Sequence, residues 1–183
     1  MAGLIDMITN NPDIAKTIAK QVGINSNDAG SIIDKLAPIL MGGAKSNLES
    51  DRDSGKLIKH IESSNYADMF DRPDKAVKEG NFTNMGNDIL SELTGSKEKS
   101  REVAKHVEKE TGFSSSLIKS ILPMLAPMII GALTKKSAPS LSNNQSTQSS
   151  SGIEGMLKNL IDQDNDGSII DDVMGMATKF IFK

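Results

Sequence analysis

The sequence contains no cysteine and no tryptophan, and its aromatic residues are limited to five phenylalanines and one tyrosine. The absence of cysteine excludes disulfide bonds, zinc sites built from thiolates and cysteine nucleophiles. Isoleucine, leucine, alanine and ten methionines dominate the apolar side chains. Because β-sheets favour aromatic and β-branched residues, this composition indicates helices that pack through aliphatic side chains. We therefore predict an all-α fold.

An excess of positive charge is also missing, since 21 lysines and arginines stand against 24 aspartates and glutamates, giving a net charge of -3. Such a chain has no general attraction to nucleic acid or to anionic lipid, so neither nucleic acid nor a membrane is an expected partner. With 183 residues, 37% of them apolar, the chain can form one domain with a small appendage.

Catalytic motifs are absent as well. The sequence has no P-loop, no GxGxxG, no GxSxG and no HExxH pattern. Its two histidines, His60 and His106, fall on polar faces of predicted helices, where we expect a surface role. The expectation is therefore a protein without catalytic residues, and a pocket holding convergent polar groups would be the sign of an enzyme instead.

Targeting and membrane segments are not recognisable either. The first residues lack a basic region and Asp6 interrupts their apolar stretch, so a cytoplasmic location is expected. The longest apolar run, Ile121 to Leu133, contains Pro123 and Pro127. It falls short of the roughly 20 residues that cross a bilayer, and we predict that it forms a buried helix.

An internal repeat organises residues 1–134. Residues 14–45 align with residues 103–134 at an offset of 89, with 11 identities in 32 positions. A match of this length indicates a duplication. The segment Met85 to Leu93 resembles the start of the chain, so each half is predicted to hold about three helices. The predicted parts of this duplicated helical bundle are two halves, about 1–46 and 85–134, and a connector, 47–84.

Helix boundaries can be predicted in both copies. Asn11 is a candidate N-cap with Pro12 in the first helical turn, and Gly23 is placed to end that helix in a left-handed conformation. In the second copy Ser96 is the candidate N-cap and Gly112 the terminating glycine. Each copy then continues into a longer apolar helix.

A Leu-Ala-Pro motif lies inside each of these longer helices. Pro38 and Pro127 each remove one backbone hydrogen bond, so each is expected to kink its helix or divide it in two. Gly42 and Gly131, one turn later, permit close backbone approach. We interpret these segments as core helices, and the alternative is a groove at the bend that receives a partner or lipid.

The connector contains its own helical signals. Residues Lys56 to Glu62 show a short helical pattern. Tyr66, Met69 and Phe70 are predicted to anchor the connector on the bundle.

The end of the chain differs in composition from the bundle. Residues 135–152 are rich in serine, asparagine and glutamine, which is typical of a flexible tether. Residues 153–183 are predicted to form a helix-loop-helix. Its first helix has apolar residues at helical spacing, namely Ile153, Met156, Leu157, Leu160 and Ile161.

The loop between these two helices carries a DxDxDG pattern, which resembles EF-hand and dockerin calcium loops. Asp162, Asp164 and Asp166 take the first, third and fifth positions, and Gly167 takes the sixth, where a sharp turn is needed. Carboxylates are hard oxygen ligands suited to calcium, and the carbonyl of Ser168 can add another. The predicted metal ligands are Asp162, Asp164, Asp166, Ser168, Asp171 and Asp172.

The closing ligand of an EF-hand is missing from this loop. Its twelfth position is normally a bidentate glutamate, but Val173 stands there. Either Asp171 or Asp172 reaches the ion, or water completes a weaker site. The alternative is a solvated acidic turn in which these two aspartates merely favour a helix N-terminus.

Taken together, GLIDMI near the start, the two Leu-Ala-Pro helices, GNDILSELTG and the terminal DQDNDGSIIDDVMGMA resemble the YidB-like bacterial family of unknown function. The resemblance spans nearly the whole chain. It implies an all-α fold and a bacterial source, and it brings no established activity.

These observations predict a non-catalytic structural or interaction protein with a structural calcium site. A single EF-hand-like unit leaves an apolar face uncovered, so self-association or docking to a protein partner is expected. The alternative function is a peripheral membrane or envelope-associated factor that uses helix 121–133 as its lipid-facing surface.

Overall fold

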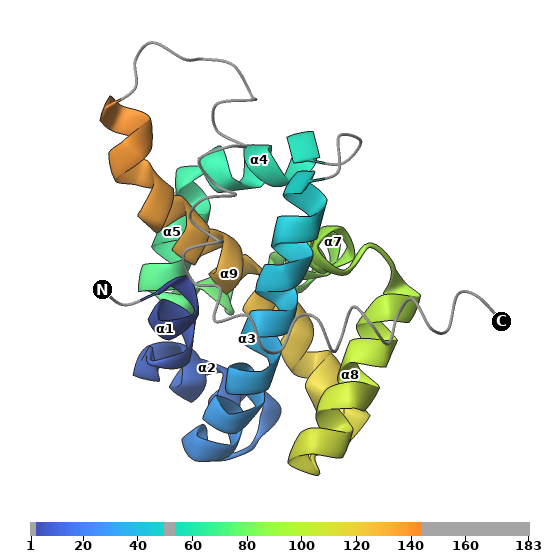
Figure 1. Cartoon of the computed structure of the whole chain (residues 1–183). Helices are drawn as coiled ribbons and strands as arrows, with labels where there is room; N and C mark the ends of the chain where they lie inside the picture. Colours follow the sequence, from blue (N-terminus) through green and yellow to red (C-terminus); the bar gives the residue numbers. More distant parts are fainter. Residues whose placement is uncertain (1–2, 50–53, 144–183) are drawn as a thin grey trace, which may run out of the picture.

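The computed structural model describes residues 3–49 and 54–143, and every regular element in these ranges is a helix, as predicted (Figure 1). The sequence forms these helices in chain order as α1 Leu4–Thr9, α2 Pro12–Val22, α3 Ser26–Glu49, α4 Ser54–Glu62, α5 Ser64–Asp71, α6 Pro73–Ala76, α7 Phe82–Thr94, α8 Lys97–Thr111 and α9 Ser115–Asn143.

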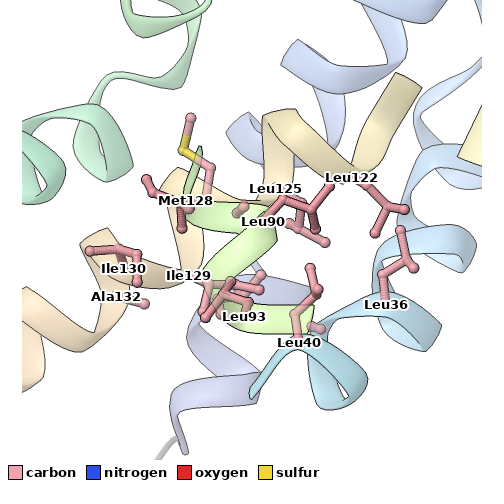
Figure 2. Packing of buried hydrophobic residues seen from close by; sticks show 14 of the residues in the cluster. Leu36, Leu40, Leu90, Leu93, Leu122, Leu125, Met128, Ile129, Ile130 and Ala132 are labelled. Atoms are coloured by element: carbon pink, nitrogen blue, oxygen red, sulfur yellow. The ribbon is translucent and has the colours of Figure 1, made fainter. Parts of the chain in front are cut away.

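Helix α9 forms the centre of the bundle. It packs against α1, α2, α3, α4, α5, α7 and α8, with its most extensive contacts to α5 and α7. Figure 1 shows it running diagonally between α8 at one end and α5 toward the other. The predicted burial of helix 121–133 is confirmed, because all of its residues except Met124 are buried. Leucines of α3 and α7 meet this helix from two directions (Figure 2).

The apolar part of α9 extends beyond the run Ile121 to Leu133 on both sides. Ser115–Ser137 covers 23 residues, which by length and composition is enough to cross a membrane, yet 78% of its most apolar window is buried inside the protein. A helix that is apolar on every side and surrounded by other helices has the character of a core helix.

The predicted helix ends are confirmed. The Asn11 side chain accepts hydrogen bonds from the backbone N–H groups of Asp13 and Ile14, at 3.0 and 3.3 Å. Ser96 caps α8 in the same way. Gly23 and Gly112 end α2 and α8 with φ values of 75° and 77°, a conformation that favours glycine.

Division at the prolines does not occur. Pro38 lies inside the single helix α3, and α9 continues through Pro123 and Pro127. Buried residues precede and follow each proline, so tertiary packing keeps each helix continuous despite the lost backbone hydrogen bonds.

Glycines mark three close helix crossings. A β-carbon on Gly43 of α3 would lie 1.8 Å from the carbonyl oxygen of Leu93 on α7. One on Gly86 of α7 would lie 1.9 Å from the carbonyl oxygen of Pro123. The expected close approach at Gly131 is also confirmed, because its β-carbon would meet the Tyr66 carbonyl oxygen at 2.2 Å. Only a hydrogen atom fits at these positions.

The connector docks on the bundle through α5, as predicted. Tyr66, Met69 and Phe70 are buried, and α5 lies along α9. The hydroxyl of Thr134 on α9 donates a 2.8 Å hydrogen bond to the carbonyl oxygen of Ile61, the penultimate residue of α4. These contacts hold the connector helices α4 and α5 against α9.

Candidate functional site: a partly buried polar cluster

The predicted calcium ligands, Asp162 to Asp172, lie outside the described residues, as does the helix-loop-helix that would carry them. Among residues 3–49 and 54–143, no group of three histidine, aspartate or glutamate side chains is placed to hold a metal ion. The stretch 135–152, expected to be a tether, begins within α9, which continues to Asn143. The calcium site therefore stays a prediction.

A polar cluster lies where α3, α4, α5 and α7 meet. The Tyr66 hydroxyl of α5 is 2.7 Å from Nδ1 of His60 on α4, and Nε2 of the same ring is 3.5 Å from Oε1 of Glu92 on α7. The His60 and Tyr66 rings meet edge to face, with centroids 5.4 Å apart. From α3, the Asn47 side-chain amide donates a 3.1 Å hydrogen bond to the backbone carbonyl of Glu92. Four helices thus contribute one polar side chain each.

The electrostatics of the cluster favour the protonated form of Tyr66. Burial raises the pKa of Tyr66, and the carboxylates of Glu92 and Asp88 raise it further. The phenol therefore keeps its proton, and it can donate that proton to Nδ1 of His60 in the tautomer that leaves this nitrogen free to accept. An imidazole that accepts at Nδ1 carries its proton on Nε2, and that proton faces Glu92.

Two oxygen atoms in this cluster can each accept a further hydrogen bond. Oδ1 of Asn47 and Oε2 of Glu92 are buried and have no hydrogen-bond partner among the described residues.

A hydrolytic triad also places a carboxylate, an imidazole and a hydroxyl in this order. Here, however, the surroundings of the hydroxyl favour its protonated form. A nucleophilic hydroxyl must lose its proton, whereas burial and two carboxylates hold the proton on Tyr66. Tyr66 is also only 5% exposed. The arrangement is suited to a latch that fixes α4 and α5 on α7.

Only part of this cluster has a signal in the sequence. Tyr66 was expected as an apolar anchor and His60 as a surface residue, yet the His60 side chain is only 27% exposed and is bonded on both sides. Asn47 and Glu92 belong to no motif. His106 matches its expected surface position more closely, since it is partly exposed and pairs with Glu110, one turn along α8, at 3.1 Å.

Removing the phenol hydroxyl tests the latch. We expect Tyr66→Phe to lower the free energy of unfolding at neutral pH by about 1 kcal/mol, the typical contribution of one hydrogen bond. In the native protein the raised pKa of Tyr66 stabilises the fold fully below about pH 10, and this contribution is lost as the pH rises through the folded-state pKa. The difference between the two proteins should therefore narrow in alkaline solution.

Two measurements check this expectation. Chemical unfolding followed by circular dichroism, from neutral to alkaline pH, gives the stability difference. Since the chain has one tyrosine and no tryptophan, the ultraviolet absorbance of tyrosinate reports Tyr66 alone. A titration midpoint at or below that of free tyrosine would contradict the buried, proton-holding latch.

The fold and the cluster define a class: an all-helical bundle assembled around one central apolar helix, with its buried polar groups used to fix helices in place. The chain belongs to the DUF937 family, described as a bacterial protein of unknown function, whose model matches residues 6–136. That match spans the bundle from α1 into α9. No curated protein and no solved structure matches the chain.

Proposed function

We propose that this protein is a non-catalytic interaction module whose C-terminal segment binds calcium as a structural ion. The observation that carries the proposal is the spacing of Asp162, Asp164 and Asp166 with Gly167, which places hard oxygen ligands around a turn of the kind used in calcium loops. Without a cation, carboxylates this close repel one another.

The bundle supports a role in binding rather than in chemistry. Its partly buried polar cluster holds Tyr66 protonated and engages both nitrogens of His60, which suits the fastening of helices. The YidB-like resemblance carried by GLIDMI and GNDILSELTG is compatible with this proposal and assigns no activity.

We further infer that the bundle arose by duplication, with α1, α2 and α3 equivalent to α7, α8 and α9. In support, α2 and α8 both begin at a capping side chain, end at a left-handed glycine and lead into a long helix with a Leu-Ala-Pro motif. Helix α8 has 15 residues against 11 in α2, a difference of about one turn.

The proposed partner is another protein or a second copy of this chain. The apolar stripe over residues 153–161, followed by a single calcium loop, needs a surface to cover it, because EF-hand-like units pack in pairs or against other helices. The alternative, a lipid-facing helix 121–133, is disfavoured by burial: Met128 and Ile129 are 1% and 0% exposed, and Met124 packs partly against the core.

Isothermal titration of the whole chain tests the calcium site. Calcium should give saturable binding, and Asp164→Ala should weaken it by more than about tenfold, because affinity depends on the number of charged ligands. Asp34→Ala is the matched control, since this exposed aspartate of α3 lies outside the loop and should leave binding unchanged. Absence of binding heat in the unaltered protein rejects the site.

Light scattering coupled to size-exclusion chromatography, with calcium and with a chelator, tests the interaction role on the same samples. A calcium-dependent increase in mass, absent in Asp164→Ala, supports self-association. A strict monomer in both conditions removes the second copy as the partner.

A further inference from the structure

A shallow cleft with a cavity volume of about 180 Å³ opens between α7, α8 and α9, away from the polar cluster. Three cationic side chains line it: Lys97 and Arg101 from α8, and Lys119 from α9. No aspartate or glutamate lines the cleft. The chain as a whole has a net charge of -3, so these three cations without a carboxylate form a local positively charged patch.

These cations are uncompensated within the part of the chain that the structure describes. Some cations of the bundle pair with carboxylates; Lys35, for example, lies 3.4 Å from Glu110. Lys97, Arg101 and Lys119 have no ion-pair partner among the described residues. Lys97 and Arg101 are also one turn apart on α8, a spacing at which like charges repel. An anion between them would remove this repulsion.

The remaining lining strengthens the case for an anion. Asn87 and Ser91 of α7 add neutral hydrogen-bond donors at the rim. Leu90 and Leu122 contribute an apolar wall and are 7% and 1% exposed. An apolar wall lowers the local dielectric constant and so strengthens the attraction between cation and anion. The cleft also borders the N-terminal turn of α8, where the helix dipole favours negative charge.

The size and donor set select the class of ligand. A volume of about 180 Å³ is below the range of about 300 to 1,000 Å³ typical of sites for drug-sized molecules, so it suits a compact group. The planar guanidinium of Arg101 can bind two oxygens of a tetrahedral oxyanion at once, and two lysines add point charges. We propose that this cleft binds a phosphate group, either free in solution or at the surface of a phospholipid.

The test uses the whole chain in calcium-free buffer at constant ionic strength, so that it is independent of the calcium site. One arm titrates inorganic pyrophosphate by calorimetry, and the other measures co-flotation with phosphatidylcholine vesicles that contain phosphatidic acid. Arg101→Gln and Lys119→Gln should each weaken binding by about tenfold. Lys59→Gln, which removes an exposed lysine of α4 outside the cleft, is the matched control and should bind like the unaltered protein.

Saturable binding in the solution arm identifies a free phosphate, and binding in the vesicle arm alone identifies a lipid headgroup; both support the phosphate site. Equal binding by Arg101→Gln and Lys59→Gln, or no saturable binding in either arm, overturns it. Because the three side chains are exposed, the variants should keep the circular dichroism spectrum and thermal unfolding midpoint of the unaltered protein.

Discussion

Replacing Gly86 with alanine is expected to lower the free energy of unfolding by about 3 kcal/mol, at the upper end of the usual effect of overpacking. The added β-carbon would lie 1.9 Å from the carbonyl oxygen of Pro123, and the next two atoms it meets also belong to that residue's backbone. No side chain can rotate away to make room. Helices α7 and α9 would have to separate, and their contact is among the most extensive in the bundle.

Chemical unfolding monitored by circular dichroism measures this effect. Gly30→Ala is the matched control, because Gly30 lies inside α3 and a β-carbon there meets nothing within 4 Å. Alanine is the better helix former, so this control should raise the stability by about 0.5 to 1 kcal/mol. Equal stability of the two variants would show that the crossing of α7 and α9 is not as close as described.

The second large effect is expected at the centre of α9. Ile129→Ala should lower the free energy of unfolding by about 3 to 4 kcal/mol, because the side chain is fully buried and its removal leaves a cavity in the core. Figure 2 shows Ile129 near leucines of neighbouring helices. The result also separates a core helix from a lipid-facing one, since a lipid-facing isoleucine would contribute to vesicle binding instead of to stability.

Met124→Ala on the same helix is the control for this experiment. Met124 is partly exposed and packs against the edge of the core, so its loss should cost less than half as much. If Ile129→Ala and Met124→Ala unfold at the same denaturant concentration as the unaltered protein, the central position of α9 is wrong.

Features with a local cause could be predicted from the sequence. Asn11 and Ser96 cap their helices because a side-chain oxygen needs only the backbone N–H groups two or three residues later. Gly23 and Gly112 end helices because a left-handed residue favours glycine wherever it occurs. The burial of helix 121–133 followed from its apolar residues.

Features that depend on packing between distant segments could not be predicted in the same way. Division at Pro38 and Pro127 was one of two expectations, and it was wrong because contacts on both sides of each proline outweigh one lost hydrogen bond. The polar cluster was missed because Asn47 and Glu92 are 45 residues apart and carry no signature until the helices meet.

The calcium loop belongs to a third category. Its ligands were chosen by spacing alone, and they lie beyond Asn143, the last described residue. Spacing specifies which oxygens can face an ion but not whether Asp171 or Asp172 completes the shell. The titration of Asp164→Ala decides whether the loop binds at all.

Because α9 lies at the centre of the bundle, the core cannot be completed until α9 has been synthesised. A ribosome releases α1 to α8 before α9, yet α9 supplies the surface on which most of those helices bury their apolar faces. Until residues 115–134 have left the exit tunnel, leucines and isoleucines from the earlier helices lack their main partner. The nascent chain therefore carries exposed apolar surface through most of its synthesis, and such surface is what chaperones bind. The last described helix is the one that completes the core.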